Sequence, residues 1–208
     1  MDDCLAITLL RHGMTGENAK GAYIGWTDAV LSDEGKKAVY AIREQVPYKE
    51  LLFSSDLSRC MATAKIIFPD QYIQPLTELR EMNFGAWEGK TYDALKELED
   101  YRKWLDDPFH VVPNGGESFT SFSGRIEMGF SKVVEEILDN SAKGATIVTH
   151  GGVIRYLLTK YSGMGHTFFE WKIPYAHGYE LIWGKESLRR RKACMSLRVV
   201  PTMEKRNG

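Results

Sequence analysis

The run Leu5-Ala6-Ile7-Thr8-Leu9-Leu10, which stops abruptly at Arg11-His12-Gly13, decides the fold class of this 208-residue chain. A continuous apolar run with β-branched members is typical of a strand that is buried on both faces, as in a parallel sheet. A second such run, Ala145–Thr149, stops in the same way at His150-Gly151-Gly152. The two runs indicate a buried sheet in which two strands end in histidine.

Helical patterns alternate with further strands along the chain. Ser32 is a good N-cap, residues from about Arg59 to Phe68 favour a helix, and Ser118 precedes the clearest helix, which Gly144 is expected to close. The remaining short apolar runs predict strands at Leu51–Phe53, Tyr72–Leu76, Tyr179–Trp183 and Cys194–Val200. This alternation predicts an α/β fold: a three-layer α/β/α sandwich around a mainly parallel sheet of about six strands.

Composition points to one globular domain over residues 1–208. Hydrophobic residues make up 43% and charged residues 26%, which excludes a disordered tail, a collagen-like fibre and a coiled-coil rod. No apolar run approaches ~20 residues, and the acidic N-terminus does not resemble a secretory signal, so neither a membrane nor secretion is expected. The three cysteines, Cys4, Cys60 and Cys194, are an odd number and lack CxxC spacing. Their number and spacing argue against a disulfide scaffold and against a cysteine zinc site, and they favour a reducing cytoplasm.

Two segments stand apart from this pattern. The stretch at about 82–117 is rich in Trp, Gly and Pro and includes an expected helix from Tyr92 to Leu105, so we expect a cap over the site. The C-terminal extension at about 185–208 carries eight basic and two acidic residues, a net charge of +6 in a chain whose total is −1. Its run Arg189–Lys192 could touch nucleic acid, but without an aromatic stacking platform a solvated turn is the preferred interpretation.

The candidate chemistry lies where strands end. Because ligands of open α/β sheets bind outside the carboxyl ends of the strands, the fold could bring His12 and His150 together. A glycine follows each histidine, which removes a side chain beside the site and lets the backbone approach a ligand.

Arginine side chains accompany the two histidines. Arg59 follows the strand at Leu51–Phe53 and opens a helix, where a cation is disfavoured by the helix dipole unless an anion offsets it. With Arg11 beside His12, the two guanidiniums predict a pocket for a tetrahedral oxyanion, phosphate above all. Glu81 could act as a general acid near the rim of such a pocket, although taken alone it reads as an exposed loop residue.

Five segments, in order, resemble the signatures of the histidine phosphatase superfamily, which includes the cofactor-dependent phosphoglycerate mutases. They are Arg11-His12-Gly13 with Thr15 and Asn18, Ser54-Ser55-x-Leu57-x-Arg59, Leu79-Arg80-Glu81-x-x-Phe84-Gly85-x-Trp87-Glu88-Gly89, Gly115-Gly116-Glu117-Ser118, and Val148-Thr149-His150-Gly151-Gly152. Within the superfamily the segment Glu78–Glu88, Tyr101-x-x-Trp104 and the start of the long helix look most like alpha-ribazole phosphatases. Met14 and Asp56 depart from the family pattern, and the basic extension has no counterpart in it.

The resemblance implies a phosphoglycerate mutase-like fold and a metal-independent phosphomonoesterase without a cofactor. His12 would form a phosphohistidine, Arg11, Arg59 and His150 would hold the phosphoryl oxygens, and Glu81 would protonate the leaving oxygen. The residues expected to bind substrate are Asn18, Thr15, Gly151, Trp26 and His177. The expected partner is a small phosphorylated metabolite, with alpha-ribazole 5'-phosphate as one candidate, and a homodimer is left open.

Two other functions compete with this one. A phosphoglycerate mutase is the nearest, and the modest length of the chain favours the phosphatase. A non-catalytic module that reads phosphorylated ligands is of another class, and it would be expected to have lost a histidine or the acid.

Overall fold

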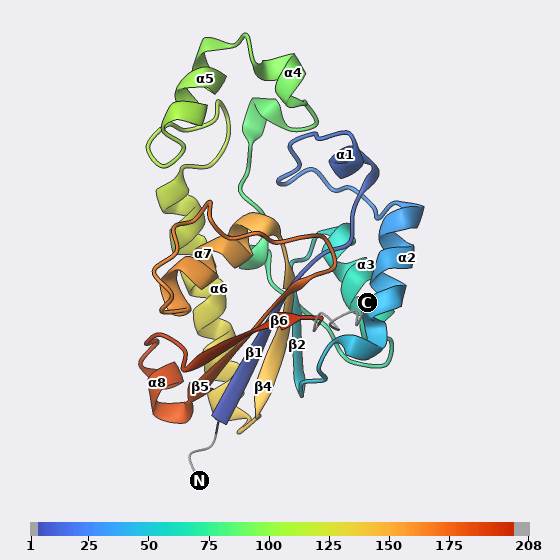
Figure 1. The fold of residues 1–208 in the computed structure, drawn as a ribbon, viewed down its shortest axis with the longest axis vertical. Coiled ribbons are helices and arrows are strands. Elements are labelled where there is room, and N and C mark those ends of the chain that lie inside the picture. Colours follow the sequence, from blue (N-terminus) through green and yellow to red (C-terminus); the bar gives the residue numbers. More distant parts are fainter. Residues whose placement is uncertain (1–3, 202–208) are drawn as a thin grey trace, which may run out of the picture.

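The computed structural model describes residues 4–201, which form a sheet of six strands and the helices around it (Figure 1). The strands are β1 (Cys4–Arg11), β2 (Leu51–Ser54), β3 (Gln74–Pro75), β4 (Gly144–Thr149), β5 (Gly178–Gly184) and β6 (Ser196–Val200). The α-helices are α1 (Gly16–Ala19), α2 (Asp33–Ile42), α3 (Ser58–Ile67), α4 (Tyr92–Leu95), α5 (Glu99–Asp106), α6 (Phe119–Asp139), α7 (Gly151–Tyr161) and α8 (Lys185–Arg189). Short 3₁₀ turns lie at η1 (Arg43–Gln45), η2 (Thr77–Leu79) and η3 (Gly85–Trp87).

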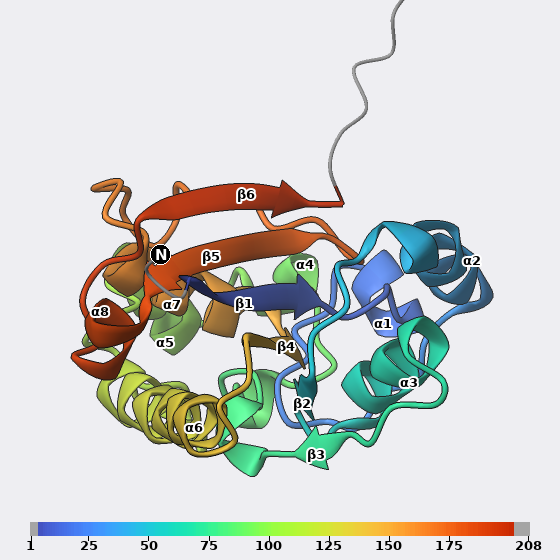
Figure 2. The ribbon, with the colours of Figure 1, turned by 90° about the horizontal axis from the view of Figure 1, so that it is seen from below.

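The strand order is β3-β2-β4-β1-β5-β6, and Figure 2 shows the strands fanning out in this order. β3, β2, β4 and β1 pair in parallel, whereas β5 runs antiparallel to β1 and β6 antiparallel to β5. The predicted mainly parallel sheet of about six strands is therefore confirmed. The antiparallel pairs belong to the last two strands of the chain.

Helices cover both faces of the sheet, which confirms the three layers (Figure 2). α6 and α7 pack on one face, in a buried cluster to which β1 contributes Ile7 and Leu9. α2 and α3 pack on the other face, in a second cluster that contains Leu10. Because successive side chains of a strand point to opposite faces, a run that is apolar at nearly every position contributes to both clusters.

Polar side chains cap the helices where the sequence indicates. Ser32 Oγ accepts from the Gly35 N–H at the start of α2, and Ser118 Oγ accepts from the Ser121 N–H at the start of α6. Each hydroxyl pairs one of the backbone donors that a helix leaves free in its first turn. The described helices contain none long and apolar enough to cross a membrane.

The structure corrects the single helix predicted from Tyr92 to Leu105. The segment forms the short helices α4 and α5, with a break between them. Leu95 and Tyr101 both pack into one buried cluster with Trp87. Six residues apart on one continuous helix, they would point roughly 120° away from each other, so the break lets both reach the cluster.

Two smaller predictions also need correction. Gly144 does not close α6, which ends at Asp139, and instead it opens β4. A Cβ atom on Gly144 would lie 2.1 Å from the carbonyl oxygen of Ala6 on the neighbouring strand, so the close approach of β1 requires glycine. The strand predicted at Tyr72–Leu76 is only Gln74–Pro75, and Tyr72 is 79% exposed.

The basic C-terminal segment is part of the sheet as far as the structure describes it. α8 packs beside β5, and β6 pairs with β5 along the edge. Arg190 and Arg189 both lie within ion-pair distance of Glu186, at 2.7 and 3.3 Å. Residues 202–208 of the predicted extension lie outside the described residues.

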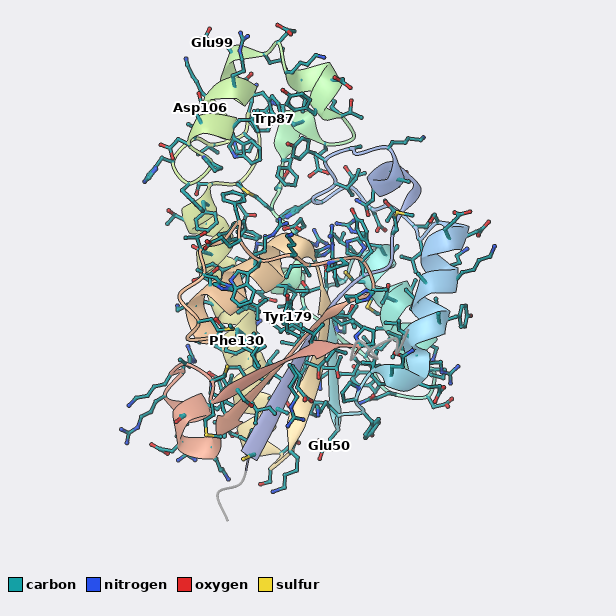
Figure 3. All side chains as sticks on the ribbon, viewed as in Figure 1. Glu50, Trp87, Glu99, Asp106, Phe130 and Tyr179 are labelled. Atoms are coloured by element: carbon teal, nitrogen blue, oxygen red, sulfur yellow. The ribbon has the colours of Figure 1, made fainter. Side chains whose placement is uncertain are left out.

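α4 and α5 stand above the carboxyl ends of the parallel strands (Figure 1). Trp87, Glu99 and Asp106 mark this upper part in Figure 3, while Glu50 marks the opposite end of the molecule. A β-bridge between Ala22 and Thr91 links the stretch at about 82–117, which we call the upper segment, to the loop that follows α1.

Candidate active site

The carboxyl ends of β1, β4 and β2 meet at one point of the sheet edge. The His12 N–H donates to the Thr149 carbonyl at 3.0 Å, and the Ser55 N–H donates to the Val148 carbonyl at 2.9 Å. These bonds place the residues that follow the three strands side by side. The rings of His12 and His150, far apart in sequence, lie 5.1 Å apart between centroids.

The His12 ring is held in one tautomer. Its Nδ1 lies 2.7 Å from the Gly13 carbonyl oxygen, which can only accept, so Nδ1 carries the proton and Nε2 keeps its lone pair. Burial lowers the pKa of His12 well below its usual value, and the charges of Arg59 and Arg11 lower it further, against the Gly13 carbonyl. His12 is therefore a neutral imidazole with a free nucleophilic nitrogen.

His150 is held equally firmly. Its Nε2 lies 2.9 Å from Ser55 Oγ, and burial and the Arg59 charge hold its pKa well below the usual value. Cys60 Sγ lies 3.5 Å from the same ring nitrogen. Burial raises the pKa of the Cys60 thiol to about 12, so the sulfur is a protonated packing neighbour.

Arg59 sits in the first turn of α3, as predicted, and is completely buried. Its Nη1 donates to the Thr27 carbonyl at 2.9 Å and its Nη2 to the Gly25 carbonyl at 2.6 Å. Its Nε atom is buried without an acceptor among the residues of the structure.

Arg11 faces the same edge. Its Nη1 donates to the Ile173 carbonyl at 2.6 Å, its guanidinium lies 3.7 Å from the centre of the Tyr175 ring, and its Nε is buried without an acceptor in the described chain. Within residues 4–201 neither Arg11 nor Arg59 forms a salt bridge. A buried guanidinium and a half-buried one, each with an unused Nε donor beside neutral histidines, are suited to bind an anion.

Glu81 is held at the rim by backbone donors, which corrects the interpretation of an exposed loop residue. Its Oε2 accepts from the Gly152 N–H at 2.9 Å, and its Oε1 accepts from its neighbour Met82 at 3.0 Å. A Cβ atom on Gly152 would lie 2.2 Å from Oε1, so a larger residue there would displace the carboxylate from this position at the start of α7. The favourable helix dipole adds to this placement.

Arg125 of α6 anchors the loop that carries Glu81. Its Nη1 donates to the Arg80 carbonyl at 2.9 Å and its Nη2 to the Glu81 carbonyl at 3.2 Å. Glu117 holds the guanidinium from the other side, through bonds of 3.0 and 2.8 Å.

Of the predicted substrate-binding residues, Thr15 and Asn18 form a capping box at α1. Thr15 Oγ1 accepts from the Asn18 N–H, and Asn18 Oδ1 accepts from the Thr15 N–H, so the side-chain NH₂ of Asn18 is the donor that this arrangement does not use. Gly151 lies against Arg11, where an added Cβ would stand 3.3 Å from Cζ. By contrast, Gly13 packs against Val39 of α2, so its close approach is to a helix and not to the site.

The side-chain hydrogen bonds of Trp26 and His177 both go to backbone carbonyls. The Trp26 indole N–H donates to the Glu81 carbonyl at 2.9 Å, which ties the tryptophan to the rim. The His177 ring bonds the Tyr175 carbonyl at 2.9 Å, while its own carbonyl accepts from the Arg11 N–H.

Several contributing residues were missed from sequence. Thr63 Oγ1 accepts from the Gly13 N–H at 3.0 Å. Thr63 lies four residues after Arg59, and this spacing places both residues on one face of the helix, a signal that the sequence carries. Ser55 ends a strand, as both histidines do. Tyr175 carried no signal, because only tertiary packing brings its loop to Arg11.

Glu88 is the least expected of these residues. Its carboxylate accepts from the backbone N–H groups of Gly25, Trp26, Thr27 and Phe84, at 2.9 to 3.1 Å. Burial would raise the pKa of Glu88, but these hydrogen bonds outweigh it and lower that pKa. Glu88 thereby holds the loop whose carbonyls hold Arg59.

The residues described here contain no group of three or more His, Cys, Asp or Glu side chains placed to hold a metal ion. The positive charge at this edge comes from arginine.

Comparison with known proteins agrees with the geometry. The model of the histidine phosphatase superfamily (branch 1) matches residues 7–192. The adenosylcobalamin/alpha-ribazole phosphatase of Escherichia coli is 30% identical over 167 residues, 77% of this chain and 80% of that protein. The crystal structure of a putative alpha-ribazole-5'-P phosphatase from Escherichia coli has a TM-score of 0.82 at 26% identity and covers 94% of this chain and 95% of that one. A phosphoglycerate mutase from Bacillus anthracis shares the fold, with a TM-score of 0.74 at 21% identity over 88% of this chain and 89% of that one.

Proposed function

Because the chain belongs to the histidine phosphatase superfamily, we propose that it is a phosphatase that hydrolyses a small phosphorylated metabolite through a phosphohistidine on His12. The observation that carries the mechanism is the state of the His12 ring. Its Nδ1 proton is committed to the Gly13 carbonyl, and its pKa is lowered, so Nε2 is a lone-pair donor at neutral pH.

In the first step Nε2 of His12 attacks phosphorus. A nitrogen–phosphorus bond forms, the phosphorus–oxygen bond to the alcohol breaks, and Glu81 in its acid form gives its proton to the leaving oxygen. In the second step water attacks the phosphohistidine, Glu81 takes a proton from that water, and inorganic phosphate leaves. His12 returns to its neutral state.

The surrounding donors stabilise the charge of the transferred group. Arg11 and Arg59 bring their unused Nε donors and two positive charges, and His150 lies beside the attacking ring. The free side-chain NH₂ of Asn18 adds a further donor. These groups are fixed by backbone carbonyls and capping bonds before substrate arrives, which is the preorganisation that such stabilisation requires.

The finer proposal concerns the substrate. Alpha-ribazole 5'-phosphate is the first candidate, supported by the names of the relatives and by the sequence pattern around Glu81. A mutase with the same fold would instead return the phosphoryl group to a second hydroxyl. Whether the phosphate appears free or transferred separates the two activities.

The test is phosphate release from a panel of phosphomonoesters in EDTA, including alpha-ribazole phosphate and 3-phosphoglycerate. We expect release by the wild type, loss of at least ~10³-fold in His12→Ala, and no loss in the matched control His110→Ala, whose histidine is exposed. A rapid acid-free quench with ³²P-labelled ester should trap label on the wild type and none on His12→Ala. Full activity of His12→Ala would overturn the proposal.

A further inference from the structure

The loop between α7 and β5 crosses the carboxyl end of β1 and binds the backbone there (Figure 1). The Arg11 N–H donates to the His177 carbonyl at 2.9 Å, and the Ala176 N–H donates to the His12 carbonyl at 3.2 Å. The same loop reaches the Arg11 side chain, because the Ile173 carbonyl accepts from its Nη1 at 2.6 Å. The stretch from Ile173 to His177, which we call the arginine loop, therefore holds both the backbone and the side chain of Arg11.

One residue of the arginine loop has a strained backbone. Ala176 has a φ of +57°, in the left-handed region where the Cβ atom of an L-residue crowds the following carbonyl oxygen. Ala176 is buried, and its hydrogen bond to His12 helps to fix this conformation. Residues strained in this way persist where the surrounding structure over-determines them, and they cluster at functional sites. The residue that precedes the strained position is Tyr175.

The Tyr175 ring covers Arg11 and also contacts His12. The central carbon of the guanidinium, Cζ, lies 3.7 Å from the centre of the Tyr175 ring, and the centroids of the Tyr175 and His12 rings lie 5.8 Å apart. At this distance no N–H group fits between Cζ and the ring, so the guanidinium and the ring stack face to face. Tyr175 thus lies against both the cation and the nucleophile of the proposed mechanism.

Gly151 lies against the opposite face of the Arg11 guanidinium. A Cβ atom on Gly151 would lie 3.3 Å from Cζ, 3.4 Å from Nε and 3.6 Å from Nη2. Because the central carbon is the nearest atom, Gly151 approaches the flat face and not the edge, and the Tyr175 ring already fills the other face. Stacking between Gly151 and Tyr175 fixes the plane of the guanidinium, and the hydrogen bond to Ile173 fixes its rotation within that plane.

The orientation of this plane decides where the donors of Arg11 point. All N–H groups of a guanidinium lie in its plane, and the Nε donor of Arg11 is buried without an acceptor in the described chain. A guanidinium held at one angle can offer its edge to two oxygens of a phosphoryl group, and the ordering is already complete before the ligand binds. The stacking contact comes from the face of the Tyr175 ring, so the hydroxyl is not required for it.

We propose that Tyr175 is a positioning residue of the phosphatase reaction proposed above, on which this inference rests. Its ring holds Arg11 against Gly151 and so aims the edge of the guanidinium at the phosphoryl group. Phenylalanine at this position should therefore replace tyrosine, whereas leucine should not. Because the effect passes through Arg11, it should vanish when residue 11 has no planar group to orient.

Hydrolysis of p-nitrophenyl phosphate by single variants tests the role of the ring. We expect Tyr175→Leu to lower kcat by roughly 10- to 100-fold and Tyr175→Phe to stay within about threefold of the wild type. Tyr72→Leu, at an exposed position, is the matched control and should keep the wild-type kcat. Wild-type activity of Tyr175→Leu, or a loss in Tyr175→Phe as large as in Tyr175→Leu, would overturn the proposal.

A double-mutant cycle tests whether the ring acts through Arg11. The cycle is measured both on kcat and on the affinity for inorganic phosphate. In an Arg11→Lys background, Tyr175→Leu should change either quantity by less than about threefold, because an ammonium group has no plane to orient. A merely structural role of Tyr175 would give the same loss in both backgrounds, and that result would overturn the proposal.

Gly151→Ala tests the other face of the stack without altering the arginine loop. The added Cβ would push the guanidinium away from its position, so we expect kcat to fall by roughly three- to tenfold. The loss should be smaller in a Tyr175→Leu background, where the guanidinium has room to shift. An unchanged kcat in Gly151→Ala would show that the plane of Arg11 does not matter for the reaction.

Binding of inorganic phosphate, measured by calorimetry, separates this inference from the proposed function. We expect the Kd for phosphate to rise about tenfold in Tyr175→Leu and to be unchanged in Tyr175→Phe and Tyr72→Leu. That pattern in a protein that hydrolyses no ester would support the positioning of Arg11 and contradict the phosphatase mechanism. Equal phosphate affinity of the wild type and Tyr175→Leu, in a protein that does hydrolyse esters, would overturn the positioning role and leave the mechanism intact.

Discussion

His12 and Glu81 illustrate how single residues acquire their chemistry from neighbours. The Gly13 carbonyl leaves His12 only one nitrogen for attack, and Gly152 makes room for the Glu81 carboxylate. Neither property belongs to the side chain alone. At this scale, the reactive form of a group is decided by one hydrogen bond or by one missing Cβ atom.

Replacing Glu81 by glutamine should slow esters according to their leaving groups. We expect kcat to fall by roughly 10²-fold or more on propyl phosphate, since an alkoxide needs the proton, and by less than about tenfold on p-nitrophenyl phosphate, since its leaving oxygen does not. Parallel measurement of both substrates on the wild type and Glu81→Gln gives the comparison. Equal losses on the two esters would rule out the acid role.

The carboxylate of Glu88 joins separate elements of the fold at the candidate site. Glu88 lies just after η3 and binds the loop at residues 25–27, and carbonyls of that loop bind Arg59 on α3. Asp28, the next residue, accepts from the Ser58 N–H at 2.8 Å at the start of α3. The upper segment, the loop that follows α1, and helix α3 thus form one hydrogen-bonded unit around the buried guanidinium of Arg59.

Glu88→Gln should weaken this unit, because an amide group places its own N–H donors against backbone N–H groups. We expect inhibition by inorganic phosphate to weaken by about tenfold and the free energy of unfolding to fall by about 1–3 kcal/mol. Glu99→Gln is the matched control, since Glu99 is an exposed residue of α5 whose carboxylate pairs with Lys103. A loss of stability without any change in phosphate inhibition would show that Glu88 does not position Arg59.

The whole molecule carries two buried neutral histidines, at the carboxyl ends of β1 and β4. Both His12 and His150 have lowered pKa values, so the folded chain stays neutral there while the unfolded chain binds protons below its usual pKa of about 6.5. The unfolded state then binds more protons, and stability falls as pH falls. Stability is therefore complete above about pH 7 and declines as the pH drops toward the lowered pKa values.

Urea unfolding between pH 7.5 and 5.0 measures this coupling. Each histidine should contribute a slope of up to about 1.4 kcal/mol per pH unit below pH 6. His12→Asn and His150→Asn should each remove about half of the slope. A slope that is the same in the wild type and in both variants would show that these histidines are not held neutral by the fold.

Local sequence was sufficient to predict the strands and helices whose own pattern of apolar residues shows that they are buried. The apolar runs before His12 and before His150 identified β1 and β4, and the regular spacing after Ser118 identified α6. The expected helix from Tyr92 to Leu105 was wrong because its break depends on a cluster built from Trp87, Leu95 and Tyr101. No local pattern contains that cluster.

By itself, the sequence determined the α/β class, the residues at the strand ends, and the pairing of histidines with arginines, because each depends on residue type and short-range spacing. Only the folded chain shows that Glu88 holds the Arg59 loop, that Tyr175 covers Arg11, and that aromatic side chains from distant segments line a cavity beside Glu81. These contacts join segments that are tens of residues apart or more. Their energies depend on distance and burial, which exist only once the chain has folded.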